Sequence, residues 1–137
     1  MPGNSIGREF VVTLFGESHG ACVGCLIDGC PSGLEMKADE IQAFIDRRQV
    51  NVLGTARREP DKVEVMSGTF RGFSTGAPIC MLMWNKDVDS TPYDEIEHTP
   101  RPGHADYSAN ARYGGFNDYR GGGIFSGRIT AGLVAAG

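Results

Sequence analysis

Two apolar runs joined by a short polar turn constrain the fold of this chain more than any other feature. Residues 10–15 (FVVTLF) and 21–27 (ACVGCLI) are apolar enough to form buried strands. Glycines at both ends of the turn (GESHG) enclose Glu17, Ser18 and His19. The second run is therefore expected either to continue the first strand or to pair with it. A connecting turn rarely needs three successive polar side chains, so this turn is a candidate functional segment.

The rest of the chain mixes strand and helix signals. Ile41, Phe44 and Ile45 recur at helical spacing, which predicts a helix over residues 38–49 with Asp39 as its N-cap. The further predicted elements are a strand over 62–70, a strand over 78–84, an irregular segment over 85–103, a short helix over 105–113, a loop over 120–123 and a helix over 126–136.

Length and charge exclude several classes of protein. The 137 residues suit a single domain, and 40% apolar with 22% charged residues is typical of globular proteins. A net charge of −4 argues against a general nucleic-acid partner. The chain has no apolar stretch of about 18 residues, and its start lacks the pattern of a secretory signal. We therefore expect a cytoplasmic protein with neither a nucleic-acid nor a membrane partner.

Arginine and glycine are both over-represented. The basic residues comprise 10 Arg and 3 Lys, and the chain has 20 Gly, about twice the usual share of roughly 7%. The planar guanidinium suits carboxylates and phosphates better than the lysine ammonium does. The excess of arginine reflects either a bias of composition or a site for a small polyanionic molecule.

Four cysteines raise the question of a metal or redox site. Cys22 and Cys25 have Cys-x-x-Cys spacing, but residues three apart on a strand point to opposite faces. No second pair completes a tetrahedral set with Cys30 or Cys80. We expect reduced thiols that pack as small hydrophobic side chains, and no metal site.

Two of the three histidines lie in glycine-flanked polar turns. His98 is surrounded by acidic residues and is expected at the surface, whereas His19 and His104 are candidates for proton transfer. A structural role is the alternative for each of these two. Asp106 lies close enough to His104 to orient its imidazole or to cap a helix.

A hydrolase is a weaker interpretation of the GESHG turn. A nucleophile elbow requires Gly-x-Ser-x-Gly, and the adjacent Ser18 and His19 are poorly placed for one to deprotonate the other. The three polar side chains are better suited to hold a phosphate oxygen and exchange a proton with it. The glycine-rich stretch at 119–137 can add backbone N–H groups that bind an anion or lie against a flat ring.

Five segments in this order and at this spacing resemble chorismate synthase. They are GESHGACVGCLIDGCPSG (16–33), RREPD (57–61), RPGHADY (101–107), YRGGG (119–123) and FSGRITAGLVAAG (125–137). The resemblance runs from Gly3 to the last residue and covers the front third or so of a typical member. It implies an α+β fold, a β-α-β sandwich with helices between two antiparallel sheets, assembled as a homotetramer. Residues 1–137 are then expected to be the amino-terminal part of a single domain that ends inside a helix.

The resemblance also implies a reaction. Members of the family are lyases of the shikimate pathway, which makes the precursor of the aromatic amino acids. They convert 5-enolpyruvylshikimate 3-phosphate to chorismate by a 1,4-elimination of phosphate. They require reduced FMN, for which NADPH is a candidate reductant. The alternative is a non-catalytic binding or scaffold module derived from this family, and we expect the isolated 137-residue chain to be inactive.

Functional residues follow from the same resemblance. The first matched histidine can protonate the leaving phosphate, and the second can protonate the reduced flavin ring. The family carries a second arginine six residues beyond its anion-binding arginine. The loop after Arg48 has no arginine at that place, so either this substrate contact is missing here or Arg57 replaces it. The matched residues are His19 and His104 for catalysis, Ser18, Arg48 and Arg128 for substrate binding, and Ile124, Phe125 and Ser126 for the flavin.

Overall fold

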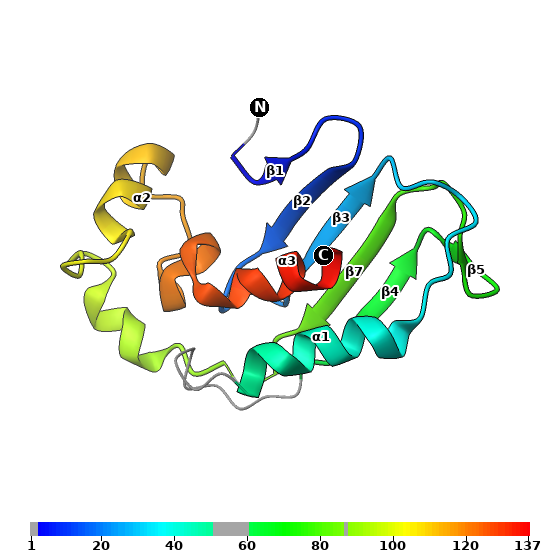
Figure 1. Ribbon diagram of the computed structural model, residues 1–137. Helices are drawn as coiled ribbons and strands as arrows, with labels where there is room; N and C mark the ends of the chain where they lie inside the picture. Colours follow the sequence, from blue (N-terminus) through cyan, green and yellow to red (C-terminus); the bar gives the residue numbers. More distant parts are fainter. Residues whose placement is uncertain (1–2, 51–60, 87) are drawn as a thin grey trace.

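A five-stranded antiparallel sheet forms the centre of the fold (Figure 1). The computed structural model describes residues 3–50, 61–86 and 88–137. The strands of the sheet, in spatial order, are β1 (Ser5–Ile6), β2 (Val11–Gly16), β3 (Cys22–Asp28), β7 (Ile79–Trp84) and β4 (Glu64–Ser67). A small antiparallel pair, β5 (Thr69–Phe70) and β6 (Phe73–Ser74), follows β4 in the chain.

The GESHG turn connects two strands that pair with each other. In the antiparallel register of β2 and β3, Leu14 lies opposite Cys25, and Gly16 lies opposite Val23. Of the two arrangements left open by the sequence, the second run is therefore the partner of the first. The strand predicted over 62–70 divides at Gly68, which has a φ of +82° that other residues rarely adopt.

Two helices cover one face of the sheet (Figure 1). They are α1 (Ala38–Val50) and α3 (Thr130–Ala136). The prediction that Asp39 is the N-cap of the first helix is wrong, because the helix begins at Ala38 and Asp39 lies in its first turn. A carboxylate in that turn still interacts favourably with the helix dipole.

Residues 91–125 lie beyond the end of the sheet at which β2 and β7 end (Figure 1). The segment predicted to be irregular contains the 3₁₀ helix η1 (Thr91–Ile96), and α2 (Asp106–Tyr113) follows it. The predicted glycine-rich loop forms the 3₁₀ segment η2 (Arg120–Phe125), with non-helical dihedrals at its three glycines. The predicted last helix consists of the 3₁₀ turn η3 (Gly127–Ile129) followed by α3.

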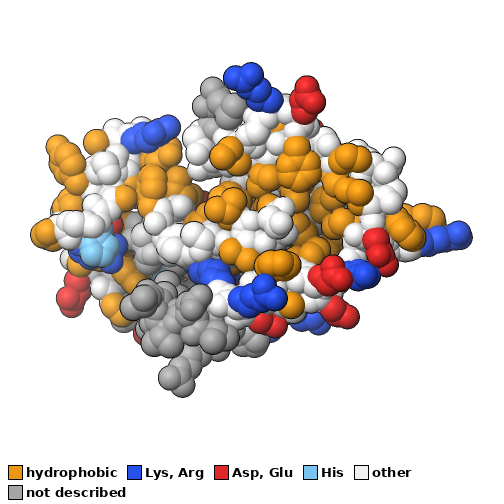
Figure 2. All heavy atoms as spheres, viewed as in Figure 1, with side chains coloured by type: hydrophobic (Ala, Val, Ile, Leu, Met, Phe, Trp, Pro, Cys, Tyr) orange, Lys and Arg blue, Asp and Glu red, His pale blue; other side chains and the backbone are white. Residues whose placement is uncertain are grey.

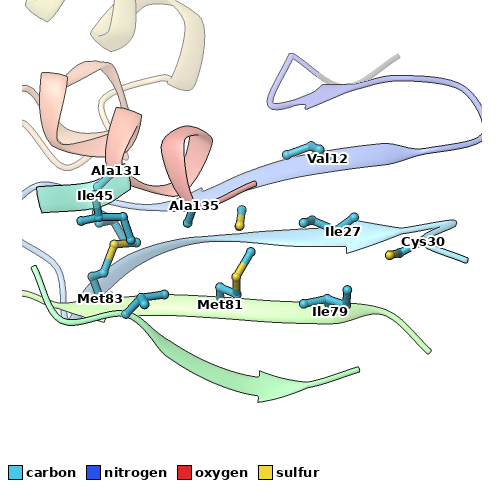
Figure 3. Close-up of a cluster of buried hydrophobic side chains, with 12 residues drawn as sticks. Val12, Ile27, Cys30, Ile45, Ile79, Met81, Met83, Ala131 and Ala135 are labelled. Atoms are coloured by element: carbon cyan, nitrogen blue, oxygen red, sulfur yellow. The ribbon is translucent and has the colours of Figure 1, made fainter. Parts of the chain in front are cut away.

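The hydrophobic core lies between the sheet and these two helices. Ile45 of α1 and Ala131 and Ala135 of α3 lie over side chains from the strands (Figure 3). Burying each large aliphatic side chain contributes about 1.5–3 kcal/mol. The small residues of α3 allow close packing, since a Cβ at Gly132 would collide with the backbone of Gly24. The strand residues of the core are Val12, Val23, Cys25, Ile27, Ile79, Met81 and Met83.

Alternation along β7 buries one half of the apolar run ICMLMW. Ile79, Met81 and Met83 are buried, whereas Trp84 on the opposite face is 45% exposed. The helical layer also carries apolar side chains on its outer side, including Phe44 and Leu133, and Figure 2 shows hydrophobic side chains across this face. No helix in the described part of the chain combines the length and apolarity needed to cross a membrane.

Candidate active site

His19 is the most enclosed titratable side chain of the GESHG turn. Only 8% of His19 and 5% of Ser18 is exposed. Nδ1 of His19 lies 3.0 Å from the hydroxyl of Ser90, and the ring meets that of Tyr93 edge-on at 4.9 Å between centroids. Both partners come from the segment after β7, some 70 residues along the chain. The imidazole is therefore held in one place by contacts that the local sequence does not contain.

The glycine-rich segment packs directly on this turn. The backbone N–H of Ser18 donates to the carbonyl of Gly123 at 3.2 Å. A Cβ at Gly121 would lie 2.8 Å from the Ser18 hydroxyl and would also collide with the His19 ring. Gly121 also has a φ of +59°. The lack of room for a Cβ and the positive φ each require glycine at position 121. The absence of a side chain there lets η2 pack against both Ser18 and His19.

Asn85 closes the turn from the other side. Its Nδ2 donates to the carbonyls of Glu17 at 3.0 Å and Gly20 at 2.8 Å, and its Oδ1 accepts from Nε of Arg128 at 2.9 Å. The carbonyls lie on either side of Ser18 and His19. The turn is thus connected through one amide group to the start of the last helical segment.

A buried carboxylate joins the two arginines predicted to bind anions. Asp61, whose side chain is 3% exposed, accepts from Arg128, and its second oxygen accepts from Arg48 at 3.2 Å. Arg48 also donates to the Thr130 hydroxyl at 2.9 Å and to the Gly127 carbonyl at 2.8 Å. The Arg128 side chain is 7% exposed and that of Arg48 is 20% exposed. A shared carboxylate offsets the repulsion between two nearby guanidinium groups.

His104 lies in a different environment. It is exposed, and its Nδ1 lies 3.1 Å from the carbonyl of Pro102. Asp106 neither caps α2 nor hydrogen-bonds this imidazole; it binds Arg101 through two side-chain nitrogens at 2.8 and 3.0 Å. Hydrogen bonding from Arg101 lowers the pKa of Asp106 to about 2. This ion pair stiffens the loop before α2.

A cavity of about 280 Å³ lies between α2, the GESHG turn and the glycine-rich segment. Its walls include Ile124 and Phe125, two of the three residues assigned to a flavin, together with Ala105, the neighbour of His104. Ser126 is not in the lining; its hydroxyl accepts from the backbone N–H of Arg128 at 3.2 Å. The other lining residues are Glu17, Asp106, Ala109, Tyr113, Phe116, Asn117, Asp118, Tyr119 and Gly122.

Two carboxylates interact electrostatically with His19. Burial raises the pKa of Asp118, but hydrogen bonds from Arg120 outweigh this and the net pKa is lowered. Hydrogen bonds from Thr91 lower the pKa of Asp89. The charge of His19 contributes in the same direction at both. Both carboxylates are therefore ionised at neutral pH, and Asp118 is paired with Arg120 at 2.8 Å.

The described cysteines are free thiols, and burial raises the pKa of Cys25 to about 11. A thiol with such a pKa is protonated and unreactive at neutral pH. Within the described ranges, no three or more His, Cys, Asp or Glu side chains are grouped to hold a metal ion. His98 is at the surface as expected, with 89% of its side chain exposed.

The structure brings together some of the predicted site residues and separates others. Ser18 and His19 meet the glycine-rich segment, and Arg48 and Arg128 both bind Asp61. His104 is not among the residues that line the cavity. Arg57 lies outside the described residues. Sequence reasoning assigned no role to Asp61, Asn85, Ser90 or Tyr93, although the first of these ends the motif RREPD.

The chain is similar to known proteins along most of its length. Residues 10–137 match the family model described as chorismate synthase. A chorismate synthase of Dehalococcoides mccartyi is 56% identical over 136 residues, and that of Thermococcus gammatolerans is 54% identical over 132 residues. The alignments cover 98% and 96% of this chain and 37% of each relative. The chain therefore spans somewhat more than a third of the length of these relatives.

A solved structure supports the same relationship. A crystal structure of a chorismate synthase superimposes with a TM-score of 0.67 at 28% sequence identity. The superposition covers 93% of this chain and 32% of the crystallised one. Together with the mixed helices and antiparallel sheet, this confirms the α+β class expected from the sequence.

Proposed function

This chain belongs to the chorismate synthase family, and from this premise we propose that its GESHG turn serves a phosphate-eliminating lyase. The substrate is 5-enolpyruvylshikimate 3-phosphate and the products are chorismate and phosphate, on the shikimate pathway. The observation that carries the proposal is the enclosed pair Ser18 and His19, held against the glycine-rich segment. The chain's relatives are much longer, so the proposal concerns a protein of their full length that carries this sequence, called the full-length protein below.

His19 is proposed as the proton donor to the departing phosphate. In the elimination, the bond between ring carbon and phosphate oxygen breaks, and a ring C–H bond breaks, its proton passing to a base or to water and its electron pair entering the conjugated system as a new C=C bond forms. The phosphate leaves with the electron pair of the broken C–O bond, and protonation by a positioned acid lowers the cost of that charge. The Ser90 hydroxyl lies at Nδ1, and Nε2 faces Gly121 of the glycine-rich segment.

The cavity beside the turn is compatible with the ring system of reduced FMN. Its volume of about 280 Å³ is near the lower end of ligand sites, and its apolar walls from Ile124, Phe125 and Ala105 suit a flat aromatic ring. The charged side chains in its described lining are acidic, so the FMN phosphate would have to be bound elsewhere. Reduced FMN, when bound, would lend electron density to the substrate and recover it. His104 is proposed as a proton donor on the flavin side.

Arg48 and Arg128 are proposed to provide the positive potential that attracts the anionic substrate. Asp61 cancels only part of their combined charge, so the cluster of three side chains is net positive. Burial lowers the pKa of Arg48, the partial desolvation that strengthens its interaction with an anion. The more exposed of the two, Arg48, is the better placed for direct contact with a substrate carboxylate or phosphate.

Assembly and flavin reduction extend the proposal. A homotetramer is supported by the exposed apolar side chains on both sides of this chain, which a further layer or subunit would cover. Sedimentation of the full-length protein would test this, and a monomer would contradict it. NADPH is the proposed source of the reducing equivalents, and anaerobic reduction of FMN by NADPH in its presence is the corresponding test.

Phosphate release under anaerobic conditions tests the proposed function. The full-length protein is incubated with the substrate and reduced FMN, and phosphate and chorismate are measured in parallel. We expect one chorismate for each phosphate, with no turnover when the flavin is oxidised. Absence of turnover with reduced FMN would contradict the proposal and favour a binding or scaffold role.

A further inference from the structure

Asn85 lies where three parts of the site meet. It follows β7, it contacts both ends of the GESHG turn, and it contacts Arg128 at the beginning of the last helical segment. Its own backbone N–H donates to the carbonyl of Ala21 at 3.0 Å. A single side chain therefore spans the turn that carries Ser18 and His19.

The chemistry of its neighbours gives the Asn85 amide a single satisfying orientation. A guanidinium only donates hydrogen bonds, so Oδ1 must face Arg128. The carbonyls of Glu17 and Gly20 only accept, so Nδ2 must face the turn. An aspartate would place an acceptor against two acceptors, and a shorter side chain would not reach both. Asparagine provides both the acceptor for Arg128 and the donor for the two carbonyls on a side chain of the right length.

The Arg128 side chain is itself held in place, so its hydrogen bond fixes the position of the Asn85 amide. Its side chain is 7% exposed, forms an ion pair with the almost fully buried Asp61 and donates to the carbonyl of Trp84 at 3.4 Å. The partners on either side thus come from segments far apart in the chain. The turn is connected through Asn85 to a rigid, charged and buried part of the fold.

We propose that Asn85 is a positioning residue for the elimination, acting on Ser18 and His19 by holding both ends of their turn. The inference rests on the proposed function, since it takes His19 to be the proton donor. Positioned acids lose efficiency when they are displaced by a fraction of an ångström. Loss of the Asn85 amide should therefore lower the rate of the chemical step more than it lowers substrate binding.

Isosteric and truncating variants of the full-length protein test this. For Asn85→Asp and Asn85→Ala we expect kcat to fall at least about tenfold, with KM changed by less than about threefold. Asn4→Asp makes the same chemical change at an exposed position and should keep the wild-type kcat. Wild-type kcat in both Asn85 variants, with wild-type protein active, would overturn the inference.

Combining Asn85→Ala with His19→Gln separates a positioning role from general destabilisation. In His19→Gln protein, Asn85→Ala should lower kcat by less than about twofold, because residues that act as a unit are not additive. A merely structural role would lower kcat by the same factor in both backgrounds. The same factor in both would therefore contradict the inference.

The imidazole resonance of His19 provides a readout that does not depend on turnover. It is assigned by its loss in His19→Gln protein, and we expect it to move in Asn85→Asp and Asn85→Ala but not in Asn4→Asp protein. If the wild-type protein releases no phosphate, the proposed function fails while this measurement still tests Asn85. An unchanged His19 resonance in both Asn85 variants would overturn the inference.

Discussion

The two turns that carry the candidate catalytic histidines are built in opposite ways. His19 is 8% exposed, and residues 71 and 74 positions further along the chain hold its ring. His104 is exposed, and its ring and backbone N–H bond to the carbonyls of Pro102 and Arg101, two and three residues before it. The first turn is fixed by the tertiary fold, whereas the second is fixed by its own sequence.

This difference indicates which half of the site the present chain organises. The turn at residues 16–20 has partners from the segment after β7, from η1 and from η2, all within the described residues. The turn at residues 101–106 is ordered by its internal Arg101–Asp106 pair and by the Arg101 guanidinium, which lies over the Tyr93 ring eight residues earlier. We infer that the environment of His19 is formed by this chain, and that His104 acquires its environment from a ligand or from other parts of the full-length protein.

The largest expected effect is the loss of the buried histidine. His19→Gln in the full-length protein should lower kcat by about 10²–10⁴-fold, the usual contribution of a positioned acid. His104→Ala should also slow turnover, but by less, because its proposed proton goes to the flavin and not to the leaving group. Steady-state phosphate release measures both. His98→Gln, at an exposed histidine, is the control, and equal rates for His19→Gln and the control would refute the assignment.

The second-largest expected effect is the loss of stability when Asp61, which pairs with Arg48 and Arg128, is replaced. Asp61→Asn should lower the free energy of unfolding by about 3 kcal/mol, because it leaves two partly buried guanidinium groups without their carboxylate. Urea unfolding of the full-length protein measures the change. Asp46→Asn removes an exposed carboxylate that binds Gln42 and should change stability by less than about 0.5 kcal/mol. A similar small effect at Asp61 would show that the cluster is not structural.

A smaller, acid-dependent effect is expected on the His104 side. The pKa of Asp106 is about 2 in the folded protein and 3.8 without its partners, so the folded state favours the carboxylate. Its contribution, on the order of 2 kcal/mol, is present above pH 4 and is lost as the pH falls toward 2. The stability difference between wild-type and Asp106→Asn protein should shrink over this range. A difference independent of pH would contradict the ion pair.

The smallest effect concerns the partner of the imidazole. Ser90→Ala removes the hydroxyl at Nδ1 of His19, a hydrogen bond worth about 0.5–1.5 kcal/mol. We expect kcat to fall by up to about tenfold and the pH profile of kcat to shift. Ser32→Ala, at an exposed serine, serves as the control. An unchanged profile would show that this contact does not set the protonation of His19.

The sequence predicts the regular elements and the motif residues but not the contacts that join them. Apolar periodicity locates the strands on either side of the GESHG turn and the helix beginning near Ala38. Apolar periodicity gives no signal for Asn85 or Ser90, because both lie in a segment without it. Their hydrogen-bond partners are some 65–71 positions away in the chain. Asp61 ends a recognisable motif, yet its role as a shared carboxylate depends on two arginines brought together only by packing.

A change of leaving group tests the central claim about His19 most directly. In a substrate whose phosphate is replaced by a phosphorofluoridate, the leaving group departs with one negative charge less and needs protonation far less. Release of each leaving group is measured for wild-type and His19→Gln full-length protein with reduced FMN. If His19 is the proton donor, the substitution should slow phosphate release at least about tenfold more than phosphorofluoridate release. An equal loss with both substrates would contradict the account.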